Sequence, residues 1–446
     1  MESYSPTIKT LLEWINTYPT STEKSSRGSF ISSKISIKDY GDEGRGLVAT
    51  SKVFNNEEII KIPHSLLLNA HSVIRHISAY NSATKLPDHY SNIELLYDPQ
   101  KTNDDISLIY SVIQYEEMLT MSSFQLVSLF LCLEAKRRSS FWRPFLDSLP
   151  TIESFQLTPL VWEVMKFKNY QKYLDLLPDQ TGTHAAEVYF RFQSDFDAVK
   201  SFLSTKLNTL HKTDALAEYL DEQQYLVAWM CINSRCLYME LRESKDSSDN
   251  FTMAPYVDFI NHTDTDQCSL KIDGRGFHVS TTTTYEQGNQ MYLSYGPHSN
   301  SFLLCEYGFT IPSNQWNDLD VSPVIIKQMN ENQIEFLKAN DYYGDYTIRK
   351  GSGVSYRTEI ALAVLQEPQP QNSRKLNAYI QGLSEGEHYS AGSRLLLEAI
   401  LTGPVKDYEN SKHLHSNGKQ DQIEERILRC IGSLYEDLKD IVDDVL

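Results

Sequence analysis

One informative motif of this sequence is Asp258-Phe259-Ile260-Asn261-His262, which is preceded by Pro255-Tyr256-Val257. It is a short apolar run that ends in two polar residues. This pattern predicts a strand that places the side chains of Asn261 and His262, and their backbone groups, at the edge of a sheet. Considered alone, the motif is also typical of a turn in which Asn and His satisfy local backbone hydrogen bonds.

A second group of motifs follows closely: Tyr292-Leu293-Ser294-Tyr295-Gly296, then Ser299-Asn300, then Glu306-Tyr307-Gly308-Phe309. Its three tyrosines fall in a predicted strand, loop and turn. They could line an aromatic channel with their hydroxyl groups pointing inward. They could equally pack in the core with their hydroxyls satisfied at its rim, which is the commoner role of tyrosine. The residues alone leave both interpretations open.

A glycine-rich turn lies nearer the N-terminus, in Gly41-Asp42-Glu43-Gly44-Arg45-Gly46-Leu47-Val48-Ala49. Glycines at positions 44 and 46 would let the backbone approach a ligand closely, because they present no side chain. The turn lacks the full glycine spacing and the following helix of a dinucleotide-binding motif. Taken alone, it is also typical of a plain connection between strands.

Periodicity divides the rest of the chain into segments. We predict an N-terminal helix in residues 1–27, strands over 28–75, a helical insertion over 76–225, strands again over 226–310 and a helical domain over 315–446. Asp273-Gly274 predicts a hairpin, with this pair supplying the positive φ of its turn. Apolar residues recur on one face of a helix near the C-terminus. The predicted fold class is α+β.

Composition narrows the class of protein. The 446 residues are 41% hydrophobic and carry a formal net charge of −18. An acidic chain lacks the basic face of a nucleic-acid binder, and it steers positively charged partners toward itself, although the charge can serve solubility alone. Six cysteines without a Cys-x-x-Cys pair predict reduced thiols in an intracellular protein. No apolar stretch is long enough to span a bilayer.

Taken together and in this order, the motifs resemble a SET domain. The resemblance rests on Gly44-Arg45-Gly46, Ser234-Arg235, Asp258 with Asn261-His262, Tyr295-Gly296 with Ser299-Asn300, and Glu306-Tyr307-Gly308-Phe309. The helical insertion and the segment from Phe141 to Pro150 are similar to the Rubisco large-subunit methyltransferase branch of this family. The resemblance implies a SET domain with a pseudoknot near Asn-His, split by the helical insertion and followed by an α-helical C-terminal domain that binds the substrate.

The resemblance also implies the cofactor S-adenosyl-L-methionine and the residues around it. Those expected to hold it are Gly44, Arg45, Gly46, Arg235, Asp258, Asn261, His262 and Tyr307. Backbone groups of His262 would meet the adenine, while Asn261 and Arg235 would meet the methionine end. Tyr307 matches the family's active-site tyrosine, and Tyr295 matches a second tyrosine of the channel. We therefore expect both tyrosines to be catalytic.

One position departs from the family pattern. Where the family often has Glu-Ser after the strand that follows the glycine turn, this chain carries His71-Ser72. If the two pairs correspond, one cofactor contact is altered. The change would affect affinity for the cofactor more than activity.

The implied reaction transfers a methyl group from a sulfonium to a nitrogen by in-line displacement, so the site mainly aligns donor and acceptor. A lysine must lose its proton first, although its pKa in water is about 10.4. A narrow, aromatic, poorly hydrated channel lowers this pKa by disfavouring the ammonium. We expect Tyr307 to orient the amine and Tyr295 to shape the channel. No metal is required.

The predicted function is S-adenosylmethionine-dependent protein-lysine N-methylation of a non-histone protein. The resemblance and the acidic charge favour a basic substrate, such as a ribosomal protein or a translation elongation factor. We expect a cytoplasmic monomer, with the nucleus also open, and no nucleic-acid or membrane partner. The substrate's identity and the number of methyl groups stay open.

Two alternatives remain beside this function, and a third, a metal site, is rejected. A histidine-modifying relative has Asn two positions after the Arg of the Ser-Arg motif, whereas this chain has Leu237, which favours lysine. A non-catalytic SET-like module could bind a basic peptide, but a decayed site usually loses the active-site tyrosine or the Asn-His pair, and both are present. A metal site would use His413 and His415, or Cys231 and Cys236, whose spacings lack a convincing second pair.

Overall fold

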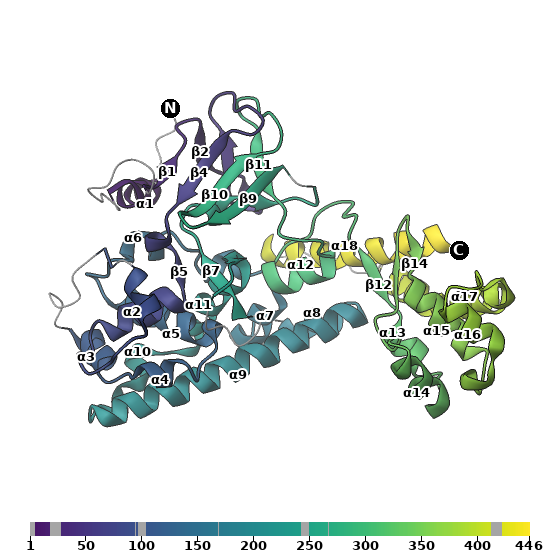
Figure 1. Cartoon of the computed structure of the whole chain (residues 1–446). Helices are drawn as coiled ribbons and strands as arrows, with labels where there is room; N and C mark the ends of the chain where they lie inside the picture. The colour runs from purple at the N-terminus through teal and green to yellow at the C-terminus, as the bar shows by residue number, and fades with distance from the viewer. Residues whose placement is uncertain are drawn as a thin grey trace. The chain divides into compact units, whose positions relative to one another are not determined.

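The computed structural model describes residues 5–17, 28–93, 95–96, 104–167, 169–241, 249–265, 267–411 and 422–446 (Figure 1). The chain forms two compact units. The first combines Met1–Gln156 with Val188–Gly296, and the second combines Leu157–Glu187 with Pro297–Leu446. These units follow packing, whereas the predicted segments follow the type of secondary structure. The predicted segment boundaries therefore stay a prediction.

In its described residues, the first unit contains three small sheets. Their strand orders are β1-β4-β10-β9, β2-β3-β11-β8 and β5-β7-β6. The strands span Phe30–Ile31 (β1), Ile35–Asp39 (β2), Arg45–Ala49 (β3), Glu58–Ile62 (β4), Leu68–Asn69 (β5), Cys236–Tyr238 (β6), Phe251–Met253 (β7), Asn261–His262 (β8), Cys268–Asp273 (β9), Gly276–Thr281 (β10) and Gln290–Leu293 (β11).

Strand β11 brings together motifs that lie far apart in the sequence. On one side it pairs antiparallel with β3, with Met291 opposite Leu47. On the other side it pairs parallel with β8, so that Tyr292 lies opposite Asn261. The glycine-rich turn, the Asn-His motif and the tyrosine motif therefore meet in one sheet, and the predicted strand at Asn-His is confirmed.

The predicted hairpin is also confirmed as β9–β10, with Asp273 opposite Gly276. The prediction that Asp273-Gly274 supplies the positive φ of the turn is wrong, because the positive φ of 132° belongs to Gly276. Asp273 Oδ1 accepts a hydrogen bond from the backbone N–H of Arg275 (2.8 Å) and so closes the turn with its side chain. A Cβ at Gly276 would overlap the carbonyl oxygen of Ile62, which explains the glycine there.

Most helices of the first unit fall in the part of the sequence predicted as a helical insertion. They are α1 (Pro6–Thr17), α2 (Ala70–Ser78), α3 (Asp105–Ser111), α4 (Tyr115–Met118), α5 (Ser123–Lys136), α6 (Arg143–Leu146), α10 (Leu216–Tyr219), α11 (Glu222–Arg235) and most of α9 (Asp179–Thr209). Helix α5 starts with a capping box, in which Ser122 and Gln125 exchange side-chain and backbone hydrogen bonds.

A buried ionic network joins α2, α3 and α5. Glu134 on α5 is fully buried and accepts hydrogen bonds from Arg137 Nη1 (3.1 Å) and from the hydroxyl of Tyr110 (3.0 Å). Arg137 also donates from Nη2 to Asp104 Oδ1 (2.9 Å), just before α3. His76 Nε2 on α2 lies 3.4 Å from Glu134 Oε1. Because these charges are out of water, each depends on its partner.

The second unit carries the C-terminal region. Its helices are α7 (Pro159–Met165), α8 (Tyr170–Asp175), the start of α9, α12 (Asn300–Tyr307), α13 (Ser322–Ile326), α14 (Glu331–Ala339), α15 (Tyr356–Leu365), α16 (Arg374–Ile380), α17 (Glu387–Ser411) and α18 (Gln422–Val445). The predicted C-terminal amphipathic helix is confirmed as α18 (Figure 1). It buries Leu438 and Ile441 in one core with Leu401 of α17.

Pattern reasoning missed a small sheet in this second unit. Strands β12 (Asp318–Asp320), β13 (Thr347–Arg349) and β14 (Gly353–Val354) pair in that order, all antiparallel. Each strand is two or three residues long, which is too short to show an alternation of apolar and polar residues. The C-terminal region is therefore mostly helical but not entirely so.

Replacing Arg137 by methionine tests the buried network. The substitution leaves the Glu134 carboxylate buried without its cation, so we expect the free energy of unfolding to fall by about 3–5 kcal/mol. Urea denaturation monitored by circular dichroism measures the change. Arg138→Met, at the exposed neighbouring position, is the matched control and should shift stability by less than about 0.5 kcal/mol. Equal unfolding curves for the two variants would contradict a stabilising role for the network.

Candidate active site

Strand β3 passes directly against two amide side chains. A Cβ at Gly46 would overlap Gln290 Oε1 and lie 2.7 Å from Asn261 Nδ2, so no larger residue fits without moving these amides. At Gly44 a Cβ would meet nothing within 4 Å, but the backbone has a φ of 73°, which favours glycine. The two glycines thus serve different purposes, and Gly46 is required by the protein's own packing.

The amides below Gly46 belong to a short chain of hydrogen bonds. Asn261 Nδ2 donates to Gln290 Oε1 (2.9 Å). Gln290 Nε2 in turn donates to Glu43 Oε2 (2.9 Å) and to the hydroxyl of Tyr292 (2.6 Å). These hydrogen bonds link the glycine-rich turn, the Asn-His motif and strand β11, and they fix the side chain of Asn261.

Two arginines surround the carboxylate of Asp258, which lies in the short 3₁₀ helix Val257–Phe259. Arg235, the last residue of α11, donates from Nη1 to the backbone oxygen (2.7 Å) and to Oδ2 (3.1 Å) of Asp258. Arg45 stacks its guanidinium on the ring of Phe259 at 4.8 Å and donates to the carbonyl oxygen of Ser148 (2.8 Å). Both guanidinium groups are partly withdrawn from water.

The electrostatics of this cluster favour an additional negative charge. Burial lowers the pKa of Arg45, and the neighbouring Arg235 lowers it further. Burial raises the pKa of Asp258, although both arginines oppose that shift. Two cations thus share one buried carboxylate. Within the described residues, Arg235 Nε and Asp258 Oδ1 are buried and accept or donate no hydrogen bond. The site therefore suits a ligand that brings a carboxylate and further polar groups.

Tyr295 holds the Asn-His motif in place through two hydrogen bonds. The backbone N–H of Tyr295 donates to His262 Nδ1 (3.0 Å), and the two rings lie 5.0 Å apart. The Tyr295 hydroxyl donates to the carbonyl oxygen of Ile260 (2.8 Å). Burial raises the pKa of Tyr295 to about 12, so its hydroxyl keeps its proton at neutral pH. The Tyr295 hydroxyl is therefore satisfied by the backbone, as in a core tyrosine, and a role of Tyr295 in a channel stays a prediction.

Tyr307 belongs to the second unit, unlike the other candidate residues. It is the last residue of α12, and Gly308 ends the helix with a φ of 83° and backbone bonds to Leu303 and Leu304. A Cβ at Gly308 would lie 2.9 Å from Thr158 Cγ2. The adjacent Glu306 is buried and pairs through Oε1 with His184 Nε2 (2.8 Å). The helix end that carries Tyr307 is therefore firmly held within its unit.

Sequence reasoning missed several neighbours of the predicted site residues, above all Gln290 and Glu43. Gln290 precedes the tyrosine motif and belongs to no recognised pattern. It faces the same side of β11 as Tyr292, since side chains at i and i+2 share a face of a strand. That alternation was the one available signal. The packing of Gly46 on its amide could not be read from the sequence.

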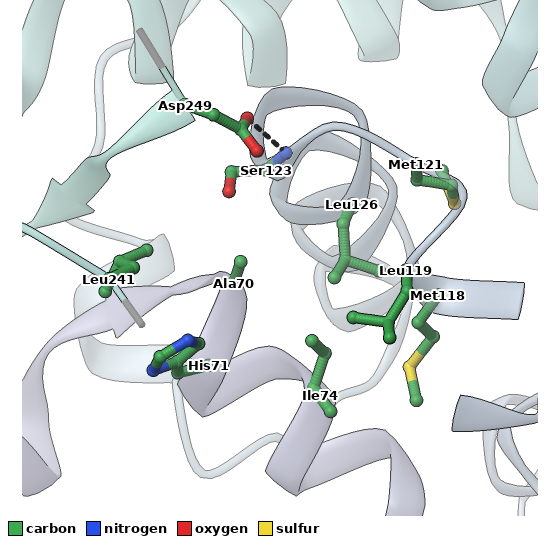
Figure 2. A pocket seen from close by; sticks show the side chains of 10 residues that line it. All are labelled: Ala70, His71, Ile74, Met118, Leu119, Met121, Ser123, Leu126, Leu241 and Asp249. Atoms are coloured by element: carbon green, nitrogen blue, oxygen red, sulfur yellow. Dashed lines mark hydrogen bonds between the residues drawn. The ribbon is translucent and has the colours of Figure 1, made fainter. Parts of the chain in front are cut away.

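His71 lies on α2 in a separate pocket of the first unit (Figure 2). The pocket has a volume of about 380 Å³, which includes space open to solvent. It is lined by Ala70, His71, Ile74, Met118, Leu119, Met121, Ser123, Leu126, Leu241 and Asp249. Figure 2 shows Asp249 accepting a hydrogen bond from the backbone of Ser123. None of the residues expected to hold the cofactor lines this pocket, so an effect of His71 on affinity stays a prediction.

Among the described residues, no group of three or more His, Cys, Asp or Glu side chains could hold a metal ion. His413 and His415 lie outside those residues, and Cys231 and Cys236 are free thiols. No helix in the described ranges is both long and apolar enough to cross a membrane.

Two protein-family models match the chain. The SET domain model matches residues 44–296, and the model for the Ribosomal lysine N-methyltransferase 2 C-terminal domain matches residues 317–446. The chain is 28% identical to Ribosomal lysine N-methyltransferase 2 of Saccharomyces cerevisiae, over 90% of both chains. It is 24% identical to Ribosomal lysine N-methyltransferase set11 of Schizosaccharomyces pombe, over 87% of both chains.

Solved structures agree on the fold. Rubisco LSMT bound to sinefungin and monomethyllysine superposes with a TM-score of 0.60 at 16% identity, covering 98% of this chain and 90% of that one. Rubisco LSMT bound to AdoMet superposes with a TM-score of 0.58 at 17% identity, covering 98% and 91%. The predicted α+β SET fold with a helical C-terminal region is therefore confirmed. With the SET model matching more than half of its residues, the chain belongs to the SET-domain family.

Proposed function

We propose that this protein is an S-adenosyl-L-methionine-dependent protein-lysine N-methyltransferase that acts on a non-histone protein. The observation that carries the proposal is the cluster of Arg45, Arg235 and Asp258 beside Asn261-His262, in a chain that belongs to the SET family. The two relatives described above, which match it over most of their length, are named ribosomal lysine N-methyltransferases.

The residues of the first unit fit the two ends of this cofactor. The methionine end carries a carboxylate, which suits the positive charge of Arg45 and Arg235. Strand β8 is the edge strand of its sheet among the described residues, and we assign the main chain of His262 on this strand to the adenine. Gly44, Gly46, Asp258 and Asn261 complete this cofactor site in the proposal.

The cofactor supplies a methyl group on a sulfonium, and the protein supplies alignment and a dry environment. We assign Tyr307 the task of orienting the lysine amine through its hydroxyl and of contacting the cofactor. Tyr295 holds the backbone of Ile260 in place and shapes the site. The acceptor amine reacts in its neutral form, which a poorly hydrated aromatic surrounding favours.

The proposed substrate is a basic protein, with a ribosomal protein ahead of a translation elongation factor. The net charge of −18 favours positively charged partners. Residues 317–446 match the C-terminal domain model of a ribosomal lysine N-methyltransferase, so we assign substrate binding to the second unit. We also propose that the enzyme acts in the cytoplasm, with the nucleus as a second site of action, and that it acts as a monomer.

Lysine is favoured over histidine by Leu237 on β6, a half-buried apolar residue that offers no hydrogen bond to an imidazole. Protein-histidine methylation is the second candidate activity. A non-catalytic module that binds a basic peptide is the third, and it is disfavoured because Tyr307 and Asn261-His262 are all present.

Replacing Arg235 by methionine tests the cofactor site. The change removes one of the two cations that would face the cofactor carboxylate, so we expect the dissociation constant for S-adenosylhomocysteine to rise by about 10–100-fold. Isothermal titration calorimetry measures it. Arg138→Met, an exposed substitution of the same kind, should bind like the wild type. Unchanged binding by Arg235→Met would remove this residue from the proposed site.

Replacing Tyr307 by phenylalanine tests the catalytic assignment. The variant loses one hydroxyl, and we expect methyl transfer to a protein substrate to slow by about 100–1000-fold, while S-adenosylhomocysteine binds within a few fold of wild type. Transfer of labelled methyl groups to proteins of a cell extract measures the rate. Tyr238→Phe, at a tyrosine that is 62% exposed, serves as the control. Wild-type rates in Tyr307→Phe would show that another group orients the amine.

A further inference from the structure

The carboxylate of Glu43 sets the orientation of the Gln290 side chain. An ionised carboxylate can only accept hydrogen bonds, so the amide group that faces it must present its NH₂. Gln290 Nε2 does so at 2.9 Å and also donates to the Tyr292 hydroxyl at 2.6 Å. Gln290 Oε1 therefore has to point away from Glu43.

The orientation passes from Gln290 to Asn261. Because Gln290 Oε1 can only accept, the side chain of Asn261 must turn its NH₂ toward it, and Nδ2 lies 2.9 Å away. Asn261 Oδ1 is the atom left over, and it accepts no hydrogen bond from any described residue. An exposed carboxylate two side chains away thus decides that Asn261 presents an acceptor and not a donor.

Strand β3 locks this arrangement. The backbone of Gly46 lies so close that a Cβ there would overlap Gln290 Oε1, and the ring of Tyr40 closes the same space at 3.1 Å from that Cβ position. Both amides therefore lie directly against the backbone of β3, and the hydrogen bonds of Gln290 with Glu43 and Asn261 set their polarity. The polarity of Asn261 is therefore built into the fold.

We propose that Gln290 is a positioning residue, which holds Asn261 Oδ1 ready to accept a hydrogen bond from the ammonium group of S-adenosyl-L-methionine. The inference rests on the proposed function, because it takes this molecule as the ligand of the site. At the methionine end, the ammonium is the group that can donate to an amide oxygen, while the carboxylate suits Arg45 and Arg235. Gln290 itself contacts protein groups and acts through Asn261.

Gln290→Glu keeps the orientation of Asn261, because a glutamate of nearly the same shape still accepts a hydrogen bond from Asn261 Nδ2. Glutamate cannot donate to Glu43 or Tyr292, and it places a second carboxylate beside Glu43. The matched control is Asn289→Asp, the same amide-to-acid change at the exposed neighbouring position. Gln290→Met is the second variant, which removes all three hydrogen bonds of the Gln290 side chain, including the one from Asn261, without adding a charge.

Calorimetric titration of the full-length protein with two ligands is the test. S-Adenosylhomocysteine carries the amino-acid end, and 5′-methylthioadenosine lacks it. We expect Gln290→Met to weaken S-adenosylhomocysteine binding by about tenfold, and Gln290→Glu to keep it within about threefold of the wild type. Binding of methylthioadenosine should stay within about twofold of the wild type in both variants. Asn289→Asp should bind both ligands like the wild type.

Other outcomes overturn the inference in distinguishable ways. Equal losses for both ligands in the folded variants would make Gln290 a purely structural residue. Unchanged binding of S-adenosylhomocysteine by Gln290→Met would show that Asn261 needs no positioning by Gln290. Failure of the wild type to bind either ligand would overturn the proposed function itself.

Discussion

The parallel pairing of β8 with β11 is the constraint on which the candidate site depends. It sets Asn261 opposite Tyr292 and His262 opposite Leu293, while the far side of β11 receives β3 and its glycine-rich turn. A two-residue parallel strand is a weak element by itself, because few main-chain bonds hold it. Its position is secured by the side chains around it: the Asn261–Gln290 amide pair and the hydroxyl of Tyr295 on Ile260.

The charge at the candidate cofactor site is opposite in sign to the net charge of the whole chain. The protein has a formal charge of −18, yet here two arginines share one buried carboxylate, that of Asp258. Burial raises the pKa of this carboxylate. Such an arrangement costs stability unless a further anion arrives, which is typical of a site shaped for a ligand rather than for the core. By contrast, the Glu134–Arg137 network satisfies its charges internally and has a structural role.

Much of this was predictable from the sequence, and the exceptions have physical reasons. The Asn-His strand, the hairpin at Asp273 and the C-terminal helix were read correctly because local patterns determine them. The positive φ was misplaced because the Asp273 side chain closes the turn and the crowded position is Gly276, beside Ile62, far away in sequence. Gln290 escaped notice for the same reason: its importance comes from contacts with Glu43 and Asn261, which no local pattern contains.

The most direct test of the account is to identify the methylated amino acid. The protein would be incubated with labelled S-adenosyl-L-methionine and ribosomal proteins that have not been methylated, and the labelled product would be hydrolysed to amino acids. The account predicts that the label is recovered as methyllysine from a ribosomal protein. Label recovered as methylhistidine without methyllysine, or no transfer at all by a protein that binds the cofactor, would contradict it.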